Sequence, residues 1–472
     1  MKFLKITTII AVVALFASSA FAQKPAPLPK DLPPYGPEKT IEAPSVKIAK
    51  LDNGLTVWLV SEPGFPKLSY TVAIRGGYAA DPSDRPGISE LLSDTIDQGT
   101  KSRNARKIAE EFQGAGGDLS ASAGRDEIEV STTILASKAE PAIAVLADIL
   151  QNASFPDDEV SLAKKNLADS LQQQEADPSF LASRAVAKVL FGTSPYHVMS
   201  PTQESIAAST PADLRKVYAQ RFRPDQTVFI AVGDFRDEKM LELMKTNFGG
   251  WKTPAESPVA DTARINPEPT HAVYLVERPG SVQTTIELAA SGPLRSDADY
   301  ESAMVANAIY GGTFGSRLTS NIREDKGYTY SPSTALNTYR AAGDFVTHAD
   351  VRNAVTGATY NEMSYELNRM VTTSPTEEEL TQAKRFLVGI EAIRFQVRSS
   401  VAGALADLWV KGLPPEEIGI YGKKIAATTS DDVDAAARKY LPASRVAIVA
   451  VGEGKVVRDT MTPFGIPIQP AP

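Results

Sequence analysis

Runs of β-branched and other apolar residues recur at matching places in two halves of the chain. Residues 57–64 return at 273–280, and residues 228–233 return at 447–452. Both pairs are offset by about 216 to 219 positions, which is the length of a whole domain rather than of a solenoid repeat. The pattern therefore predicts two copies of one unit in this chain.

The two copies share an internal order. A β-branched strand comes first, helical stretches follow, and a helix with acidic residues near its start (210–214 and 429–433) precedes the closing strand. In the first copy, the small-residue segment 116–123 and the alternating segment 127–134 predict two joined strands. Strands mixed with long helices predict an α+β fold of two homologous α/β sandwich domains, each with helices covering a largely antiparallel sheet.

The N-terminus has the pattern of a secretion signal. Lys2 and Lys5 precede an apolar run at residues 6–17, and residues 20–22 form an A-x-A cleavage site. The apolar run is short for a membrane span. We therefore expect an exported protein, periplasmic or secreted, that is cleaved after Ala22.

Proline-rich stretches mark the remaining boundaries, because proline cannot continue a helix or a sheet ladder. These stretches fall in the segments 23–44 and 253–270. The predicted parts are a signal peptide (1–22), a Pro-rich tether (23–44), a first domain (45–252), a linker (253–270), a second domain (271–456) and a C-terminal tail (457–472).

The composition excludes several classes of function. The hydrophobic share is 43%, the charged share is 22% and the net charge is −8, as in an ordinary globular protein. This acidic balance argues against nucleic acid or an anionic membrane surface as a partner, and no later segment predicts a membrane span. The chain has no cysteine, which excludes disulfides, thiolate catalysis and cysteine-ligated metal.

Residues 87–100 predict a helix with one buried side. Gly87 lies at its start and Gly99 is expected to end it. The predicted buried residues are Ile88, Leu91, Leu92, Thr95 and Ile96. Glu90 and Asp94 are one helical turn apart and are expected, with Ser93, on another face.

This segment resembles the metal-binding helix of the M16 peptidases, the pitrilysin-like or inverzincin family. The family pattern is roughly G-x-x-H-x-x-E-H-x-x-x-x-G-T, in which two histidines hold zinc and the glutamate activates water. Here Glu90 and Asp94 occupy the histidine positions and Ser93 occupies the glutamate position. The family's third ligand is a glutamate, but residues 169–171, the matching region, contain none. The resemblance therefore implies that this chain has no zinc site of its own.

Residues 310–331 resemble the C-terminal domain of the same family. They contain a Gly-rich turn, then S-R-L, then R-E-x-x-G-x-x-Y-S. The resemblance implies that Arg323 and Tyr330, with Tyr328 as the competing tyrosine, reach a peptide at the zinc site of a facing domain. A guanidinium and a phenol can both donate to a carbonyl oxygen that gains negative charge during hydrolysis.

The segment 116–123 matches a family strand that receives the peptide at a sheet edge. Its small side chains would let a peptide backbone approach closely, although an ordinary hairpin strand is an equally good interpretation. The expected substrate-binding residues are Gly117, Ser120, Ala121, Ser122, Gly312 and Ser316.

The resemblance implies an M16 subunit that is inactive alone, and the N-terminal signal pattern implies that it is exported. Its expected partner is a homologous chain with H-x-x-E-H, which brings the zinc and completes a clamshell metallopeptidase for peptide substrates. Two alternatives remain. One is a homodimeric peptidase with an atypical metal site on Glu90, Asp94 and Asp169, and the other is a non-catalytic peptide-binding or scaffold protein.

Overall fold

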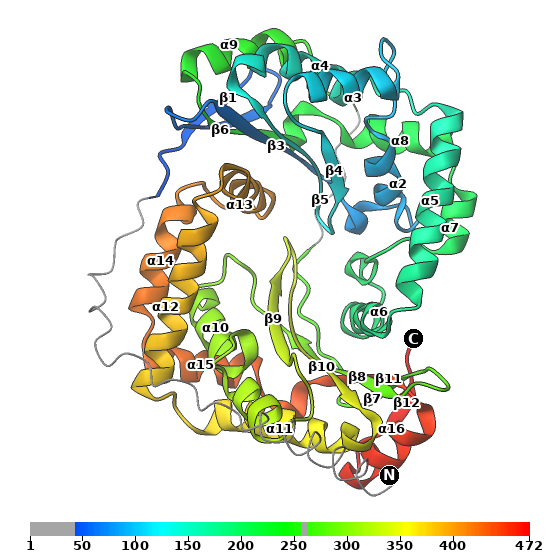
Figure 1. Ribbon diagram of the computed structural model, residues 1–472, viewed down its shortest axis with the longest axis vertical. Coiled ribbons are helices and arrows are strands. Elements are labelled where there is room, and N and C mark those ends of the chain that lie inside the picture. The colour runs from blue at the N-terminus through cyan, green and yellow to red at the C-terminus, as the bar shows by residue number, and fades with distance from the viewer. Residues whose placement is uncertain (1–42, 256–262) are drawn as a thin grey trace, which may run out of the picture. The chain divides into compact units, whose positions relative to one another are not determined.

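The computed structural model describes residues 43–255 and 263–472. The expected signal peptide, the tether up to residue 42 and residues 256–262 of the expected linker lie outside this described part. The described residues contain two six-stranded sheets with helices packed against them (Figure 1). The predicted α+β class with two sheet-containing halves is therefore confirmed.

The first sheet has the strand order β1-β2-β6-β3-β5-β4. Its strands are β1 (Lys47–Lys50), β2 (Thr56–Ser61), β3 (Lys67–Arg75), β4 (Ser120–Ala123), β5 (Glu127–Leu135) and β6 (Thr227–Gly233). Only β2 and β6 pair in parallel, so the sheet is largely antiparallel. The predicted hairpin is present as β4 and β5, and β4 is an edge strand.

The second sheet has the strand order β12-β7-β11-β8-β10-β9. Its strands are β7 (Val273–Glu277), β8 (Gln283–Ser291), β9 (Ser333–Thr338), β10 (Gly343–Arg352), β11 (Ala447–Gly452) and β12 (Ile468–Pro470). From β7 onward the order repeats that of the first sheet, which confirms the predicted duplication. β12 belongs to the expected C-terminal tail, and it pairs in parallel with β7.

The helices also follow the repeat. Those of the first half are α2 (Ile88–Thr95), α3 (Ala105–Gly114), α4 (Ala139–Asn152), α5 (Asp157–Glu175), α6 (Pro178–Phe191), α7 (Gln203–Ala208), α8 (Pro211–Arg221) and α9 (Asp237–Phe248). Those of the second half are α10 (Tyr300–Asn307), α11 (Thr356–Thr372), α12 (Glu377–Arg394), α13 (Arg398–Val410), α14 (Glu417–Ala427), α15 (Ser430–Tyr440) and α16 (Gly454–Met461). None of these described helices has the length and hydropathy needed to cross a bilayer.

The predicted acid-capped helices are α8 and α15. Thr210 accepts a hydrogen bond from the backbone N–H of Asp213, and the Asp213 carboxylate accepts one from the backbone N–H of Thr210. Thr429 and Asp432 make the same reciprocal pair at α15. These capping boxes satisfy backbone donors that a helix start leaves unpaired, which is why the short local pattern predicted both helix starts.

Each sheet buries its second face under a helix from the other half of the chain. In β2, Val57 faces the core of its own half, whereas Trp58 and Val60 pack with residues of α13. Correspondingly, Val449 of β11 packs with residues of α6. Figure 1 shows α13 beside the first sheet and α6 beside the second.

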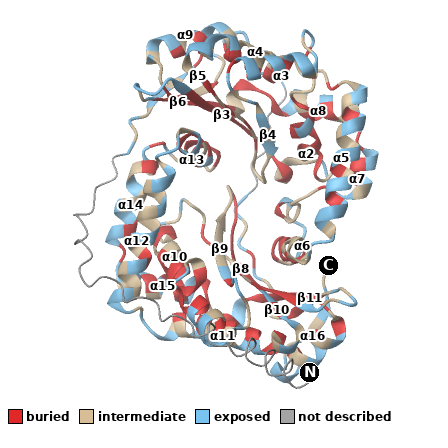
Figure 2. Cartoon of the chain, viewed as in Figure 1, coloured by how far each residue is buried: buried red, intermediate tan, exposed pale blue. Residues whose placement is uncertain are grey.

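Burial on both faces explains the continuous apolar runs seen in the sequence. β6 and β11 are buried at every position, as Figure 2 shows for the central strands of both sheets. A strand that is covered on both faces loses the alternation of apolar and polar residues. The runs 228–233 and 447–452 therefore reflect the exchanged helices as well as the sheets.

Candidate functional site

The start of α2 is held by a buried polar cluster. Gly87 precedes the helix with φ of +81°, and a Cβ at this position would lie 2.2 Å from Cα of Pro201, so only glycine fits. The Asp81 carboxylate accepts hydrogen bonds from the N–H of Gly87 (2.8 Å) and the hydroxyl of Ser89 (2.5 Å). Arg221 pairs with Asp81 at 3.0 Å. The predicted start of the helix is confirmed.

The predicted end of this helix at Gly99 is wrong, because α2 ends at Thr95. Gly99 forms an isolated bridge with Asn104, and Thr100 forms one with Ala153. The backbone must leave the helical conformation before Gly99 to make these pairings. The Gly–Thr dipeptide of the family pattern therefore belongs to the turn after the helix.

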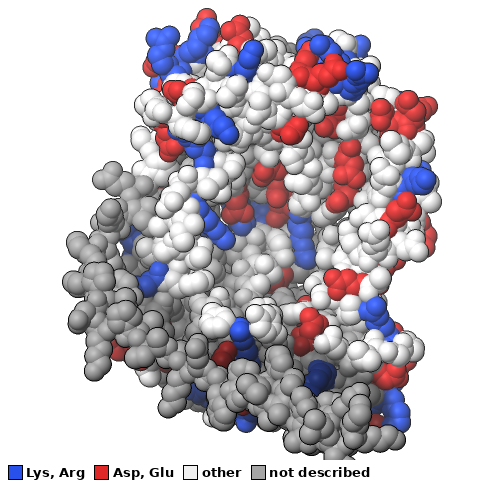
Figure 3. All heavy atoms as spheres, viewed as in Figure 1, with Lys and Arg blue, Asp and Glu red and all other residues white. Residues whose placement is uncertain are grey.

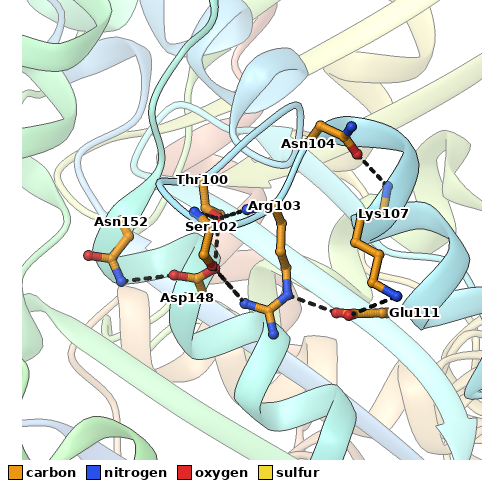
Figure 4. Close-up of polar contacts among 8 residues, drawn as sticks. All are labelled: Thr100, Ser102, Arg103, Asn104, Lys107, Glu111, Asp148 and Asn152. Atoms are coloured by element: carbon orange, nitrogen blue, oxygen red, sulfur yellow. Dashed lines mark hydrogen bonds and ion pairs between the residues drawn. The ribbon is translucent and has the colours of Figure 1, made fainter.

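Asp148 holds this turn, as Figure 4 shows. Its carboxylate accepts hydrogen bonds from Thr100 (2.7 Å), Ser102 (2.8 Å), Arg103 (2.6 Å) and Asn152 (2.9 Å). Burial alone would raise the pKa of Asp148, but these bonds lower it below the ordinary value. Arg103 also donates to Glu111 of α3 at 2.8 Å. The network ties the turn after α2 to α3 and α4.

The degenerate motif positions differ in their burial. The predicted buried residues Ile88, Leu91, Leu92, Thr95 and Ile96 are all buried. Ser93, which was expected with Glu90 and Asp94 on another face, is 3% exposed, so it is buried whereas Asp94 is exposed. Its hydroxyl donates to the backbone carbonyl of Glu90 at 2.8 Å. Ser93 therefore stabilises the helix backbone and offers no base to activate water.

Glu90 and Asp94 line one pocket of about 430 Å³ together with Gln98 of the same segment and Asn166 and Ser170 of α5. Burial and the neighbouring Asp94 raise the pKa of Glu90 to about 7. Burial and the neighbouring Asp97 raise the pKa of Asp94 to about 6. The Glu90 carboxylate also accepts a hydrogen bond from the hydroxyl of Tyr78. The Glu90 carboxyl therefore titrates near neutral pH, and Asp94 loses its proton at a lower pH than Glu90.

These side chains do not fit a zinc ion, which favours nitrogen and sulfur donors. The third member of the atypical site considered above, Asp169, is exposed and does not line the pocket with Glu90 and Asp94. Over residues 43–255 and 263–472, no group of three or more His, Cys, Asp or Glu side chains is placed to hold a metal ion. The structure therefore does not assemble that alternative site.

Replacing Glu90 by glutamine is expected to stabilise the protein at pH 8 by about 1–2 kcal/mol, a figure reduced for the partial exposure of the side chain. The folded state holds the Glu90 proton more tightly than the unfolded chain, since the folded pKa is about 7 against an ordinary 4.5. Stability from this group is thus complete below pH 4.5 and is lost as the pH rises to 7. Chemical unfolding of Glu90→Gln at pH 4 and pH 8 measures the difference.

The control for that prediction is Glu140→Gln on α4, because Glu140 is exposed. Its effect should be within about 0.5 kcal/mol at both pH values. A Glu90→Gln protein that is less stable than the parent at pH 8 would contradict the prediction. It would show that the charged carboxylate has a favourable partner in the folded state.

Among the described residues, only β5 pairs with the candidate peptide-binding strand β4, so the other edge of β4 has no strand beside it there. Ser120 and Ser122 are exposed and Ala121 is half-buried. Gly117 precedes the strand, and a Cβ there would lie 2.1 Å from the carbonyl oxygen of Thr133. α2 packs against β4, so the edge and the degenerate metal helix are neighbours.

Arg323 lies between two exposed aromatic rings. Its guanidinium carbon is 4.4 Å from the ring centroid of Phe314 and 4.5 Å from that of Tyr330. The two aromatic residues are 69% and 79% exposed, respectively. Arg323 also pairs with Glu324 at 3.1 Å. The structure thus brings Arg323 and Tyr330 together, as an exposed cation–π stack.

The competing tyrosine, Tyr328, is placed differently. It is half-buried, and its backbone N–H donates to the carbonyl of Ile322 at 2.9 Å. Gly327 before it has φ of +61°, which turns the chain between the two tyrosines. This geometry favours Tyr330 over Tyr328 as the partner of Arg323.

Two partly buried contacts anchor the segment that carries Arg323. Arg317 donates to both carboxylate oxygens of Glu379 on α12, at 2.7 and 3.0 Å, and holds the pKa of Glu379 at about 2. Asn321 donates to Glu362 (3.0 Å) and Glu366 (2.8 Å) of α11. Neither residue type nor spacing in the sequence singles out Phe314, Arg317 or Asn321. The S-R-L part of the family pattern was the only signal for Arg317.

The other two residues that were expected to bind substrate, Gly312 and Ser316, lie in the same segment. Ser316 is 2% exposed, and its hydroxyl donates to that of Thr319 at 3.0 Å. Gly312 ends the π-helical turn η6 (Ala308–Gly312), where a Cβ would lie 2.8 Å from Nδ2 of Asn307. Both residues support the turn that presents Phe314.

Carboxylates gather where the first sheet meets α13. Asp126, Asp407 and burial raise the pKa of Glu127 to about 7, with burial the largest cause. Lys411 pairs with Asp407 at 2.6 Å. Figure 3 shows both Asp and Glu and Lys and Arg side chains around the hollowed centre of one face.

The fold and the site define a two-domain, peptidase-like protein. Its helix α2 corresponds to the metal-binding helix of the peptidases but lacks zinc donors. Residues 56–201 match the model of the insulinase family, peptidase family M16. Residues 209–387 match the model of the peptidase M16 inactive domain. The chain belongs to peptidase family M16. The helix α2 falls within the insulinase match, so the inactive-domain match makes no statement about it.

Relatives of this chain carry different functional names. An uncharacterized zinc protease of Rickettsia felis is 24% identical over 79% of this chain and 90% of its own length. The non-peptidase homolog YmxG of Helicobacter pylori is 23% identical over 73% of this chain and 79% of its own. These names do not agree on activity, so the residues of the site have to decide it.

Two solved structures have the same fold. A peptidase M16 inactive domain from Pseudomonas fluorescens superposes with a TM-score of 0.81 at 27% identity, covering 86% of this chain and 98% of that one. A protease from Helicobacter pylori superposes with a TM-score of 0.82 at 19% identity, covering 87% of this chain and all of that one. The chain is an inactive-peptidase-like member of family M16.

Proposed function

We propose that this chain is the non-zinc subunit of an exported M16 peptidase. One observation carries the proposal: Arg323 is presented between exposed Phe314 and Tyr330, while α2 offers Glu90 and Asp94 where zinc ligands belong. A guanidinium and a phenol bind and polarise a peptide carbonyl, but neither activates water unaided. The chain thus holds one half of a hydrolytic site.

The partner is a homologous M16 chain with H-x-x-E-H, and it brings the zinc. That ion supplies a nucleophilic water and polarises the scissile carbonyl. Arg323 and Tyr330 of this chain donate hydrogen bonds to the same peptide and stabilise the developing negative charge. The open edge of β4, with Gly117 before it and Ser120, Ala121 and Ser122 along it, binds a peptide backbone by strand addition.

The expected signal peptide supports export to the periplasm, where the substrate is an extracytoplasmic peptide. The mature chain then begins at Gln23. N-terminal sequencing of the protein from the periplasmic fraction tests this location. A chain that keeps Met1 in the cytoplasmic fraction contradicts it.

The isolated mature chain is expected to cleave no peptide and to bind no stoichiometric zinc, because its motif lacks zinc donors and a base. Co-expression with the H-x-x-E-H homologue should give a complex that cleaves peptides and loses activity with a chelator. A fluorogenic peptide library and elemental analysis of both preparations measure these outcomes. Robust zinc-dependent cleavage by the isolated chain would overturn the proposal.

The scaffold alternative predicts a different result. If the chain only binds peptides or proteins, an Arg323→Ala variant leaves every peptidase activity of the cell envelope unchanged. Comparing envelope extracts of the parent and variant strains, with one peptide library, separates the two functions.

A further inference from the structure

Helix α12 carries an exposed apolar stripe. Phe386 is 42% exposed, Ile390 is 37% exposed and Ile393 is 62% exposed. Their spacing of four and then three residues places them on one side of the helix. Val397, in the turn after α12, continues the stripe and is 50% exposed. Exposed apolar side chains gathered on one side of a helix are candidates for a binding surface, whereas singly scattered ones are not.

The fold itself does not require these apolar residues. Helix α5 is the counterpart of α12 in the first half, and both begin with three acidic residues and carry Ala–Lys at the same place, 163–164 and 383–384. In α5 the positions of Phe386, Ile390 and Ile393 are occupied by Asn166, Ser170 and Gln173. Since α5 takes the same place in the fold with polar side chains, the stripe serves something other than folding.

The same face lines a pocket in the first half. Asn166 and Ser170 line the pocket that contains Glu90 and Asp94, the positions where the family holds its metal. Because the two halves repeat one fold, the face of α12 that carries Phe386 and Ile390 corresponds to this face of α5.

The stripe also begins close to the Arg323 segment. The same helix pairs with Arg317 through Glu379, and Gln382 lies 3.8 Å from the Cβ position of Gly315. Phe386 follows Gln382 by one helical turn, and Gly315 follows exposed Phe314. A peptide held at Arg323 therefore has the stripe within reach of its next few residues.

The charges beside the stripe favour an acidic neighbour. Arg394 lies at the end of α12 and Lys423 lies on α14, and both are exposed. The two helices are in contact there, because a Cβ at Gly422 would lie 3.7 Å from the Glu391 carboxylate. Glu391 is half-buried, and burial raises its pKa to about 7, so it opposes these cations only in part.

We infer that the stripe binds an apolar stretch of the peptide substrate, flanked by acidic residues, next to the part held by Arg323. This inference rests on the proposed function for the role of Arg323. From Phe386 to Ile393 the helix rises about 10 Å, which matches about three residues of extended peptide.

The test replaces the stripe residues of α12 by the residues at the equivalent positions of α5. It uses the full mature chain without any partner. The variant F386N/I390S/I393Q introduces into α12 the side chains that its counterpart α5 carries at the equivalent positions. The probe is a fluorescein-labelled peptide with three leucines between aspartates, and its anisotropy gives the affinity. The variant should bind at least about tenfold more weakly, as expected for losing buried apolar side chains. A peptide with serines for leucines should bind both proteins equally weakly.

The matched control is Val282→Ser, because Val282 is 81% exposed and lies between β7 and β8, away from α12. It should bind the leucine peptide like the parent. Equal affinity of the parent and the stripe variant would overturn the inference. So would a parent dimer in sedimentation that the stripe variant dissociates, because the stripe would then join two copies. Neither result bears on cleavage with the zinc partner, so the proposed function is tested separately.

Discussion

Replacing Arg323 by alanine is expected to lower the kcat of the assembled peptidase by about ten- to a thousand-fold, the usual effect of removing one donor to a developing oxyanion. The guanidinium is held between Phe314 and Tyr330, so its position is set before the peptide arrives. A preorganised donor acts on the transition state more than on the bound substrate, and kcat should therefore fall more than KM rises. Steady-state kinetics of the complex with one fluorogenic peptide measure both constants.

Substitutions of the tyrosines divide this effect into its parts. Tyr330→Phe keeps the ring that stacks on Arg323 and removes only the hydroxyl donor, whereas Tyr330→Leu removes both. The leucine variant should therefore be the slower of the two. Tyr328→Phe and the exposed Lys326→Ala should leave kcat within about twofold. An unchanged kcat in Arg323→Ala would show that Arg323 does not contact the reacting carbonyl.

Replacing Arg221 by methionine is expected to lower the free energy of unfolding by about 3–5 kcal/mol, because it leaves a buried carboxylate without its cation. The side chains of Arg221 and Asp81 are each 1% exposed and pair at 3.0 Å. Arg221 also donates to the carbonyl oxygen of Gly76 (2.8 Å) and to the hydroxyl of Ser89 (2.6 Å). Urea unfolding of the isolated chain at pH 7 measures the loss.

The control is Arg106→Met on α3. Arg106 pairs with Glu110 at 2.8 Å, but its side chain is 87% exposed, so the change should cost about 0.5 kcal/mol or less. If Arg221→Met and Arg106→Met unfold at the same urea concentration, the buried pair does not stabilise the start of α2. A large loss would show that the buried pair at the start of α2 stabilises the fold.

The parts of the fold that follow from local patterns were predictable. The capping boxes at Thr210 and Thr429 each need only four consecutive residues, and the buried side of α2 needs only the helical period. The start of α2 was predictable for the same reason. Its end was not, because Gly99 and Thr100 pair with Asn104 and Ala153, and such pairings leave no mark on the helical period.

The candidate site shows the same division. The family pattern pointed to Arg323 and Tyr330, and the structure places them in contact. The family pattern did not indicate that Phe314 completes the stack or that the Ser93 hydroxyl donates to the backbone carbonyl of Glu90, since both depend on side-chain positions in the folded chain. The burial that raises the pKa of Glu90 likewise arises only when α5 covers α2.

The sequence by itself determined the duplication, the strand and helix order of each half, and the loss of zinc donors at Glu90, Ser93 and Asp94. Those features are written in residue types and short spacings. Only the tertiary structure decided that α13 covers the first sheet and α6 covers the second, and that the apolar side chains of α12 remain exposed. An apolar helix face looks the same in sequence whichever surface it meets, because the hydrophobic effect depends on area and carries no direction.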